Sequence, residues 1–165
     1  MTNSGEYMKC GKSCTFFGHR YIDVCEKFKQ SLYAYIERLI KIEGYESFYF
    51  GGFGEFDDLC WQIVTRLRTI YPYIRRIYCL TDYRHLNRRK RPLYLKDENY
   101  EEFVYLNVKF EWWFKRIYYR NIAMIDACDY AIFYVKNSTN SGAYKTYQYA
   151  LSNKKQLLNT YEMFS

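Results

Sequence analysis

The stretch SFYFGGFGEFDDL, residues 47–59, decides the fold that we expect for this chain. Its first residues form an apolar run typical of a buried strand, three glycines follow, and a helical pattern begins directly after them. A glycine-rich turn between a strand and a helix usually holds a phosphate on its backbone amides. Three carboxylates, Glu55, Asp57 and Asp58, stand beside this turn, and by Coulomb's law they repel a phosphate.

The position of these acids has two explanations. Carboxylates accept hydrogen bonds from sugar hydroxyls and base amines, so Glu55 and Asp57 would face the ribose or the base of a nucleotide. Alternatively, both residues only occupy the first turn of a helix, where the helix dipole favours acids. Both explanations stay open for Glu55 and Asp57, and for Asp58 the sequence favours the helix turn.

The rest of the chain repeats the alternation of strand and helix. Continuously apolar strands joined by helices are typical of a parallel sheet that is covered on both faces. The sequence therefore predicts an α/β fold, a single Rossmann-like domain with a mostly parallel central sheet, over residues 14–165 after an N-terminal arm at residues 1–13. The expected strands span residues 14–19, 47–50, 75–80, 130–135 and 156–159, with a short extended piece near 103–108, and the expected helices span residues 21–43, 55–71, 111–128 and 141–153.

Composition and charge limit the partners that the chain would bind. Hydrophobic residues make up 49% of the 165 residues, which excludes disorder of the whole chain, and the formal net charge of +7 favours anionic partners. Much of the positive charge lies in residues 84–91, here called the basic loop, which is either a solvated loop or a contact for an anion. No signal peptide or long apolar run is present, so we expect a cytoplasmic protein without a membrane partner.

The cysteines do not indicate a metal or a disulfide framework. Without a secretory segment, the six cysteines are expected to be reduced. Cys10, Cys14, His19 and Cys25 lie close in sequence, but their spacings match no zinc motif, and Cys14 enters a predicted strand. The sequence therefore predicts no metal site and no cofactor.

Glycine-containing turns follow three of the expected strands, at residues 18–20, 51–54 and 137–146. Each turn opens a helix whose first amides favour an anion, and ligands of open parallel sheets bind outside the carboxyl ends of the strands. The three turns therefore predict one cleft, in which the last turn holds the phosphate. The expected ligand-binding residues are Gly18, His19, Arg20, Gly51, Gly52, Phe53, Gly54, Glu55, Asp57, Ser141, Gly142, Ala143, Lys145 and Thr146.

Four segments together resemble the SLOG superfamily, which includes the lysine-decarboxylase-like LOG enzymes, the DprA proteins and the YpsA-like proteins. The resemblance is greatest to the YpsA-like proteins, keeps the same order over most of residues 14–160 and weakens at residues 81–110. It implies a Rossmann-like fold that binds nucleotides or nucleotide-derived ligands, and it adds Arg120 and Asn121 to the expected binding residues. The segments are TFFGHR at 15–20, GGFGEFD at 51–57, RNIAMIDACDYAI at 120–132 and SGAYKTYQYA at 141–150.

The same resemblance separates an enzyme from a binding protein. Arg120, Met124 and Asp129 fit the opening of the LOG motif, but Gln148 stands where the LOG enzymes have a catalytic glutamate. An amide cannot exchange a proton as a carboxylate does, so the resemblance implies a protein that binds its ligand without LOG-type hydrolysis. Without the resemblance, Arg120 is as readily explained as an exposed helical arginine paired with an acid.

Three functions follow from these observations. The first is a protein, expected to be a homo-oligomer, that senses or sequesters a nucleotide-derived signal such as an ADP-ribose-like molecule or a cyclic nucleotide; by analogy it would serve in bacterial or phage immune pathways. The second is a nucleotide N-glycosidase or phosphoribohydrolase-type hydrolase, with Glu55 or Asp57 as the catalytic group. The third is DprA-like binding of nucleic acid through the basic loop, which we consider unlikely because no recognition-helix motif is present.

Overall fold

The computed structural model describes residues 11–106, 115–137 and 140–163, and it confirms the α/β class and the Rossmann-like arrangement. Six strands form one sheet in the order β4-β3-β2-β1-β5-β6, and every neighbouring pair is parallel. The strands are β1 (Lys12–Gly18), β2 (Tyr45–Phe50), β3 (Arg75–Cys79), β4 (Glu102–Val104), β5 (Tyr130–Tyr134) and β6 (Leu157–Asn159). The helices are α1 (Glu26–Lys41), α2 (Glu55–Ile70), α3 (Arg116–Ala127), α4 (Gly142–Ser152) and α5 (Thr160–Met163).

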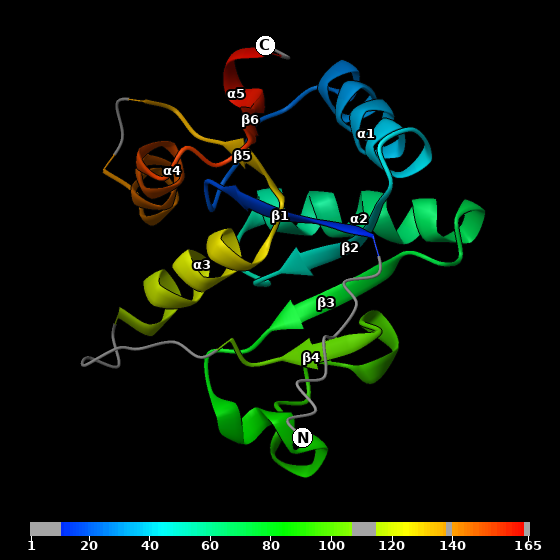
Figure 1. Ribbon diagram of the computed structural model, residues 1–165, viewed down its shortest axis with the longest axis vertical. Helices are drawn as coiled ribbons and strands as arrows, with labels where there is room; N and C mark the ends of the chain where they lie inside the picture. Colours follow the sequence, from blue (N-terminus) through cyan, green and yellow to red (C-terminus); the bar gives the residue numbers. More distant parts are fainter. Residues whose placement is uncertain (1–10, 107–114, 138–139, 164–165) are drawn as a thin grey trace, which may run out of the picture.

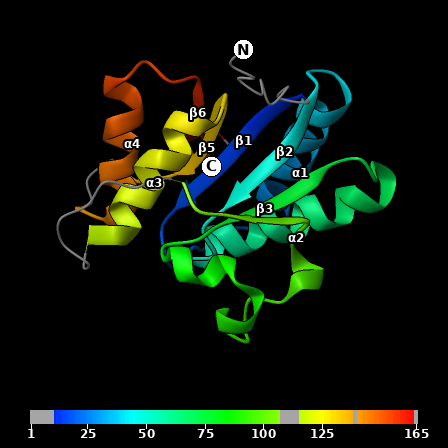
Figure 2. The same ribbon diagram turned by 60° about the horizontal axis from the view of Figure 1, so that its bottom comes forward.

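Helices cover both faces of the sheet (Figure 1). The helices α1 and α2 pack on one face, and α3 and α4 pack on the other, as the turned view also shows (Figure 2). This layering follows from the strand sequence, because successive side chains of a strand point to opposite faces. In β1, Phe16 packs with the cluster under α1 and α2, whereas the neighbouring Phe17 packs with the cluster under α3 and α4.

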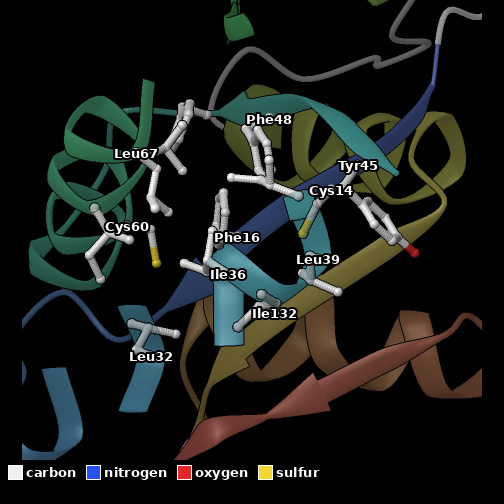
Figure 3. Packing of buried hydrophobic residues seen from close by; sticks show 14 of the residues in the cluster. Cys14, Phe16, Leu32, Ile36, Leu39, Tyr45, Phe48, Cys60, Leu67 and Ile132 are labelled. Carbon is white, nitrogen blue, oxygen red and sulfur yellow. The ribbon is translucent and has the colours of Figure 1, made fainter. Parts of the chain in front are cut away.

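The core under α1 and α2 holds the largest cluster of buried side chains (Figure 3). Phe16 stacks on Phe48 of the adjacent strand, with the ring centroids 6.1 Å apart. Leu32 and Ile36 of α1 and Leu67 of α2 are fully buried against these rings. Burying such apolar area is the main favourable contribution to folding, so this cluster holds the carboxyl ends of β1 and β2 in fixed positions.

The order in which the strands are added to the sheet reverses at β1. From β1 the chain winds outward through β2 and β3 to β4, and then returns to pair β5 with the other side of β1. Helices therefore leave the carboxyl ends of β1 and β5 toward opposite faces, which leaves a crevice between these two ends. The cleft described below lies at this point.

The structure differs from the sequence-based expectation at three places. The first helix starts at Glu26 instead of near residue 21, because the backbone amide of Ile22 donates to the Glu55 carboxylate at 2.7 Å and the segment before the helix stays extended. The segment between β3 and β4, for which the sequence predicts no helix or strand, contains three short 3-10 helices. They span Tyr83–Leu86, Arg88–Lys90 and Asp97–Asn99. The short helix α5 was not expected, and part of the predicted helix 111–128, residues 111–114, lies outside the described residues.

Buried charges attach the segment before β4 to the domain. The Arg76 side chain is almost fully buried and donates to the Glu101 carboxylate at 2.7 Å, to Thr65 and to the Glu98 carbonyl. The Arg91 guanidinium lies 3.7 Å from the centroid of the Phe103 ring.

None of the helices in the described part of the chain has the length and apolar character needed to span a bilayer.

Candidate functional site

A cleft with a cavity volume of about 170 Å³ opens at the carboxyl ends of β1, β2 and β5. It lies at the reversal point of the sheet, where ligands of this type of fold bind. Its walls come from the turns that follow these strands, from α3 and from the start of α4. The lining residues are Phe16, Phe17, Gly18, His19, Arg20, Gly51, Phe53, Asp57, Ile117, Arg120, Asn121, Ser141, Gly142 and Ala143.

The glycine-rich turn after β2 holds an anion that belongs to the protein itself. The backbone amides of Gly51 and Gly52 donate to the two carboxylate oxygens of Asp57, at 3.4 and 3.0 Å. Gly52 has a φ of +68°, a conformation that favours glycine. At the start of α2, the Glu55 amide donates to the Arg20 carbonyl at 2.9 Å. The first two amides after β2 are therefore engaged by Asp57, whose carboxylate has partners within the protein.

Asp57 is buried in the wall of the cleft, with only 6% of the residue exposed. Burial raises the pKa of this carboxyl from its ordinary 3.8 to about 7, although the charge of Arg120 and the amides of Gly51 and Gly52 lower it. A buried carboxyl with a pKa near 7 takes up and releases a proton at physiological pH. Such a group in a cleft is a candidate for proton transfer or for charge-sensitive binding.

Arg120 of α3 is the buried cation of the cleft, with 4% of the residue exposed. Its guanidinium donates to the Gly51 carbonyl at 3.0 Å, to the Cys79 carbonyl at 3.5 Å and to the Asn121 side chain at 3.3 Å. Its Nε has no hydrogen-bond partner, and no carboxylate of the described residues lies within 4.0 Å of it. The explanation of Arg120 as an exposed arginine paired with an acid is therefore wrong.

Gly51 allows Arg120 to reach the cleft. A β-carbon at this position would lie 2.5 Å from Arg120 Nη2 and 2.9 Å from Cζ, which is closer than real contacts allow. The two residues are 69 positions apart in the sequence, and their contact holds α3 against the end of β2. Asp57 interacts with the charge of Arg120 through space, but Arg120 forms no direct ion pair with a described carboxylate. A buried charge without a direct ion pair costs free energy.

His19 connects the ends of β1 and β5 to the start of α4. Its Nε2 accepts a hydrogen bond from the Lys136 amide at 2.8 Å, and its Nδ1 lies 3.5 Å from Ser141 Oγ. Because Nε2 accepts, a neutral ring carries its proton on Nδ1, facing Ser141. Burial lowers the pKa of His19 below 6.5, which favours this neutral form.

The start of α4 presents backbone amides to the cleft. Ser141 is the N-cap, and its hydroxyl accepts from the Tyr144 amide at 3.1 Å. Gly142 and Ala143 occupy the first two helical positions, whose amides have no partner within a helix, and both residues line the cleft. No atom lies within 4 Å of a β-carbon built on Gly142, so the space over this helix start is open to a ligand.

The structure brings eleven of the sixteen expected binding residues to the cleft and leaves five outside its lining. Glu55 accepts a hydrogen bond from the Ile22 amide and faces a separate groove, so its carboxylate holds the segment before α1. Thr146 is fully buried and donates to the Gly142 carbonyl at 3.0 Å, which makes it a helix residue and not a phosphate ligand. Lys145 is exposed on α4. The remaining two, Gly52 and Gly54, shape the turn after β2.

Three residues of the cleft were missed in the sequence: Phe16, Phe17 and Ile117. Phe16 and Phe17 are the last residues of β1 before Gly18. Their position at the carboxyl end of this strand is the sequence feature that could have predicted their place in the cleft. Ile117 lies at the start of α3, four residues from Asn121 and so on the same side of the helix. Gln148, which the resemblance aligns with the catalytic glutamate of the LOG enzymes, is exposed on α4 and does not line the cleft.

The basic loop carries less free charge than its sequence indicates. Arg84 forms an ion pair with Asp82 at 2.6 Å, Arg91 forms one with Asp97 at 2.6 Å, and Arg88 also contacts Asp97. Arg91 is mostly buried, and it also donates to backbone carbonyls of the loop. Most of the cations that suggested a nucleic-acid contact therefore stabilise the loop itself.

The fold and the cleft together define a Rossmann-like domain whose cleft, at the reversal point of the sheet, is lined by Arg20, Arg120 and Asp57. Within the described residues, no group of three or more histidine, cysteine or acidic side chains is placed to hold a metal ion. No protein-family model matches the chain, and no curated protein matches its sequence. The resemblance to the SLOG superfamily stays a prediction.

Proposed function

We propose that this protein binds a phosphorylated, nucleotide-derived small molecule in the cleft and so senses or sequesters it. One observation carries the proposal: Arg120 is buried in the cleft wall and has no carboxylate within 4.0 Å among the described residues. A phosphate would give its guanidinium a direct ion-pair partner. Charge-assisted hydrogen bonds to such a group are among the stronger ones in proteins.

The phosphate would lie between Arg120 and the start of α4. Helix N-termini favour anions through their unpaired amides and the helix dipole, and here those amides belong to Gly142 and Ala143. Arg20 adds a second cation at the edge of the cleft. The Gly51 and Gly52 amides are not part of this phosphate site, because Asp57 accepts from both of them.

Isothermal titration calorimetry tests the proposal directly. The panel contains inorganic phosphate, ribose 5-phosphate, adenosine and guanosine monophosphates, cyclic nucleotides and ADP-ribose. We expect at least one phosphorylated compound to bind with a dissociation constant well below millimolar. Arg120→Gln keeps hydrogen-bond donors but removes the charge, so it should weaken this binding at least about tenfold, since such a bond contributes roughly 1.5–3 kcal/mol.

Arg66→Gln is the matched control, because Arg66 is exposed on α2 outside the cleft. It should bind as the wild type does. Thermal unfolding of all three proteins shows whether each variant is folded. The proposal fails if no phosphorylated compound binds the folded wild-type protein. It also fails if Arg120→Gln binds the compound as tightly as the control Arg66→Gln does.

A hydrolase is the second candidate, and Asp57 is the observation that favours it. A cleft carboxyl whose pKa is raised to about 7 is suited to act as a general acid or base. Incubation with nucleoside monophosphates and NAD, followed by chromatography for released base, measures this activity. Release of base that Asp57→Asn abolishes supports the hydrolase, whereas binding without release supports the binding protein.

A further inference from the structure

The cleft is too small to enclose a whole nucleotide. Its cavity volume is about 170 Å³, whereas sites that enclose a drug-sized molecule have roughly 300–1,000 Å³. A ligand whose phosphate lies between Arg120 and α4 would therefore extend out of the cleft and across its rim. The side chains on that rim decide which part of the ligand is recognised there.

Phe53 is the apolar side chain of this rim. It lines the cleft, is 54% exposed and belongs to none of the buried clusters of the described core. The glycines on either side, Gly52 and Gly54, have φ angles of +68° and +99°, so they hold the turn in a conformation that other residues rarely adopt. A phenyl ring kept in water forgoes the stabilisation that burial would bring. Burial in the described core therefore does not explain a phenylalanine here, and its ring is accessible at the rim of the cleft.

The guanidinium of Arg20 lies over the Phe53 ring. It is 5.5 Å from the centroid of Phe53 and 5.6 Å from that of Tyr21. The Arg20 carbonyl accepts from the Glu55 amide at 2.9 Å, which ties the turn after β1 to the turn after β2. Two turns from different strands thus bring together a phenyl ring and a planar guanidinium, and both groups stack on flat rings.

We propose that Phe53 and Arg20 form a stacking subsite for the heterocyclic base of the ligand. This inference rests on the proposed binding of a phosphate in the cleft. The base stacks on the face of the Phe53 ring that the Arg20 guanidinium does not cover, and the ribose spans the distance from the rim to the phosphate. Every base has a flat face, so this subsite selects ligands that carry a ring and discriminates weakly among the bases.

Paired probes with and without a base test the subsite. Calorimetry compares adenosine 5′-monophosphate with ribose 5-phosphate on the wild type, on Phe53→Ala and on Phe53→Trp. We expect the wild type to bind the nucleotide about fivefold to a hundredfold more tightly than ribose 5-phosphate, the range that stacking on an aromatic side chain provides. Phe53→Ala should lose this difference and keep its affinity for ribose 5-phosphate, and Phe53→Trp should restore the difference.

The outcomes separate this inference from the proposed function. If ribose 5-phosphate and the nucleotide bind the wild type equally well, the phosphate site stands and the stacking subsite is overturned. If Phe53→Ala weakens both probes to the same degree, Phe53 acts through the structure of the turn and the subsite is again overturned. If neither probe nor inorganic phosphate binds, the phosphate site and the inference built on it both fail. Because Phe53 is exposed, thermal unfolding of Phe53→Ala should match that of the wild type.

Discussion

The two oxygens of the Asp57 carboxylate accept hydrogen bonds from the amides of Gly51 and Gly52. These amides would otherwise form a small concave site for an anion. The protein fills that site with its own side chain and leaves Arg120, on the other side of Gly51, without a carboxylate partner. At the scale of single residues, the Asp57 carboxylate has partners in the turn, whereas the Arg120 guanidinium has only neutral partners among the described residues.

Asp57 should make the stability of the protein depend on pH. Its pKa is about 7 in the folded state against 3.8 ordinarily, so the folded state binds this proton more tightly than the unfolded state does. The resulting stabilisation is fully present below about pH 4 and is lost as the pH rises toward 7, at roughly 1.4 kcal/mol per pH unit. Asp57→Asn cannot ionise and should lack this loss. Chemical denaturation of both proteins from about pH 5 to about pH 8 measures the difference.

The comparison of the two proteins also removes the effect of His19. The pKa of His19 is lowered by burial, so its contribution has the opposite sign and is lost as the pH falls below 6.5. Both proteins contain His19, and the difference between their curves therefore reports Asp57 alone. Parallel curves over this range would show that Asp57 does not titrate as described.

Gly51→Ala should move Arg120 out of place. The new β-carbon would lie 2.5 Å from Arg120 Nη2, and the buried guanidinium has little room to shift. We expect a loss of about 1–3 kcal/mol in the free energy of unfolding, as for other overpacked sites, together with weaker binding of adenosine 5′-monophosphate. Chemical denaturation and calorimetry measure the two effects. Gly142→Ala is the control for stability, since its β-carbon would meet no atom within 4 Å, and an equal loss in both variants would contradict the steric explanation.

At the scale of elements, α4 has a start that serves both the helix and the cleft. The Ser141 hydroxyl caps the helix by accepting from the Tyr144 amide, while the next two residues line the cleft. The charge of the N-cap side chain matters little for capping the helix but matters for a phosphate bound nearby. Asparagine and aspartate cap helices about equally well, but only aspartate repels a phosphate.

Substitutions at Ser141 should therefore separate stability from binding. Ser141→Ala should lower the free energy of unfolding by about 1 kcal/mol, whereas Ser141→Asn and Ser141→Asp should keep the cap. For adenosine 5′-monophosphate, we expect Ser141→Asp to bind much more weakly than Ser141→Asn, because the two side chains have similar shapes and differ in charge. Denaturation and calorimetry measure the two rankings. Equal affinity of the Asn and Asp variants would place the phosphate away from α4.

At the scale of the whole molecule, the distribution of charge matters more than its sum. The formal net charge is +7, but the basic loop pairs Arg84 with Asp82, and Arg88 and Arg91 with Asp97. Arg89 and Lys90 remain without an ion pair among the described residues. Expected self-association of the chain stays a prediction, which light scattering after size-exclusion chromatography would measure.

Binding of nucleic acid through the basic loop should be weak. Each phosphate contact contributes about −0.9 to the slope of log K against log salt on duplex DNA. With two unpaired cations, the loop should give a slope no steeper than about −2, and the double variant with Arg89→Ala and Lys90→Ala should abolish it. Fluorescence anisotropy with a labelled duplex measures this slope. A slope of about −5 or steeper would show that the ion pairs of the loop open on DNA.

The sequence alone was sufficient to predict the α/β class and the edge of the sheet at which the cleft lies. Apolar runs of strand length, helical stripes and glycines at strand ends are local patterns, and the turns at Gly18, Gly51 and Ser141 do meet in the cleft. These predictions succeeded because backbone geometry ties such patterns to particular elements. The β-strand limits were accurate to within a few residues for the same reason.

Only the tertiary structure decided what each cleft residue does. Sequence reasoning could not tell that Asp57 would occupy the amides of the glycine turn, or that Glu55 and Thr146 would bond within their own neighbourhoods. It also could not show that Arg120 would be buried against Gly51, because that contact joins residues 69 positions apart. Hydrogen-bond partners and burial depend on which distant segments pack together, and no local pattern of residues encodes that choice.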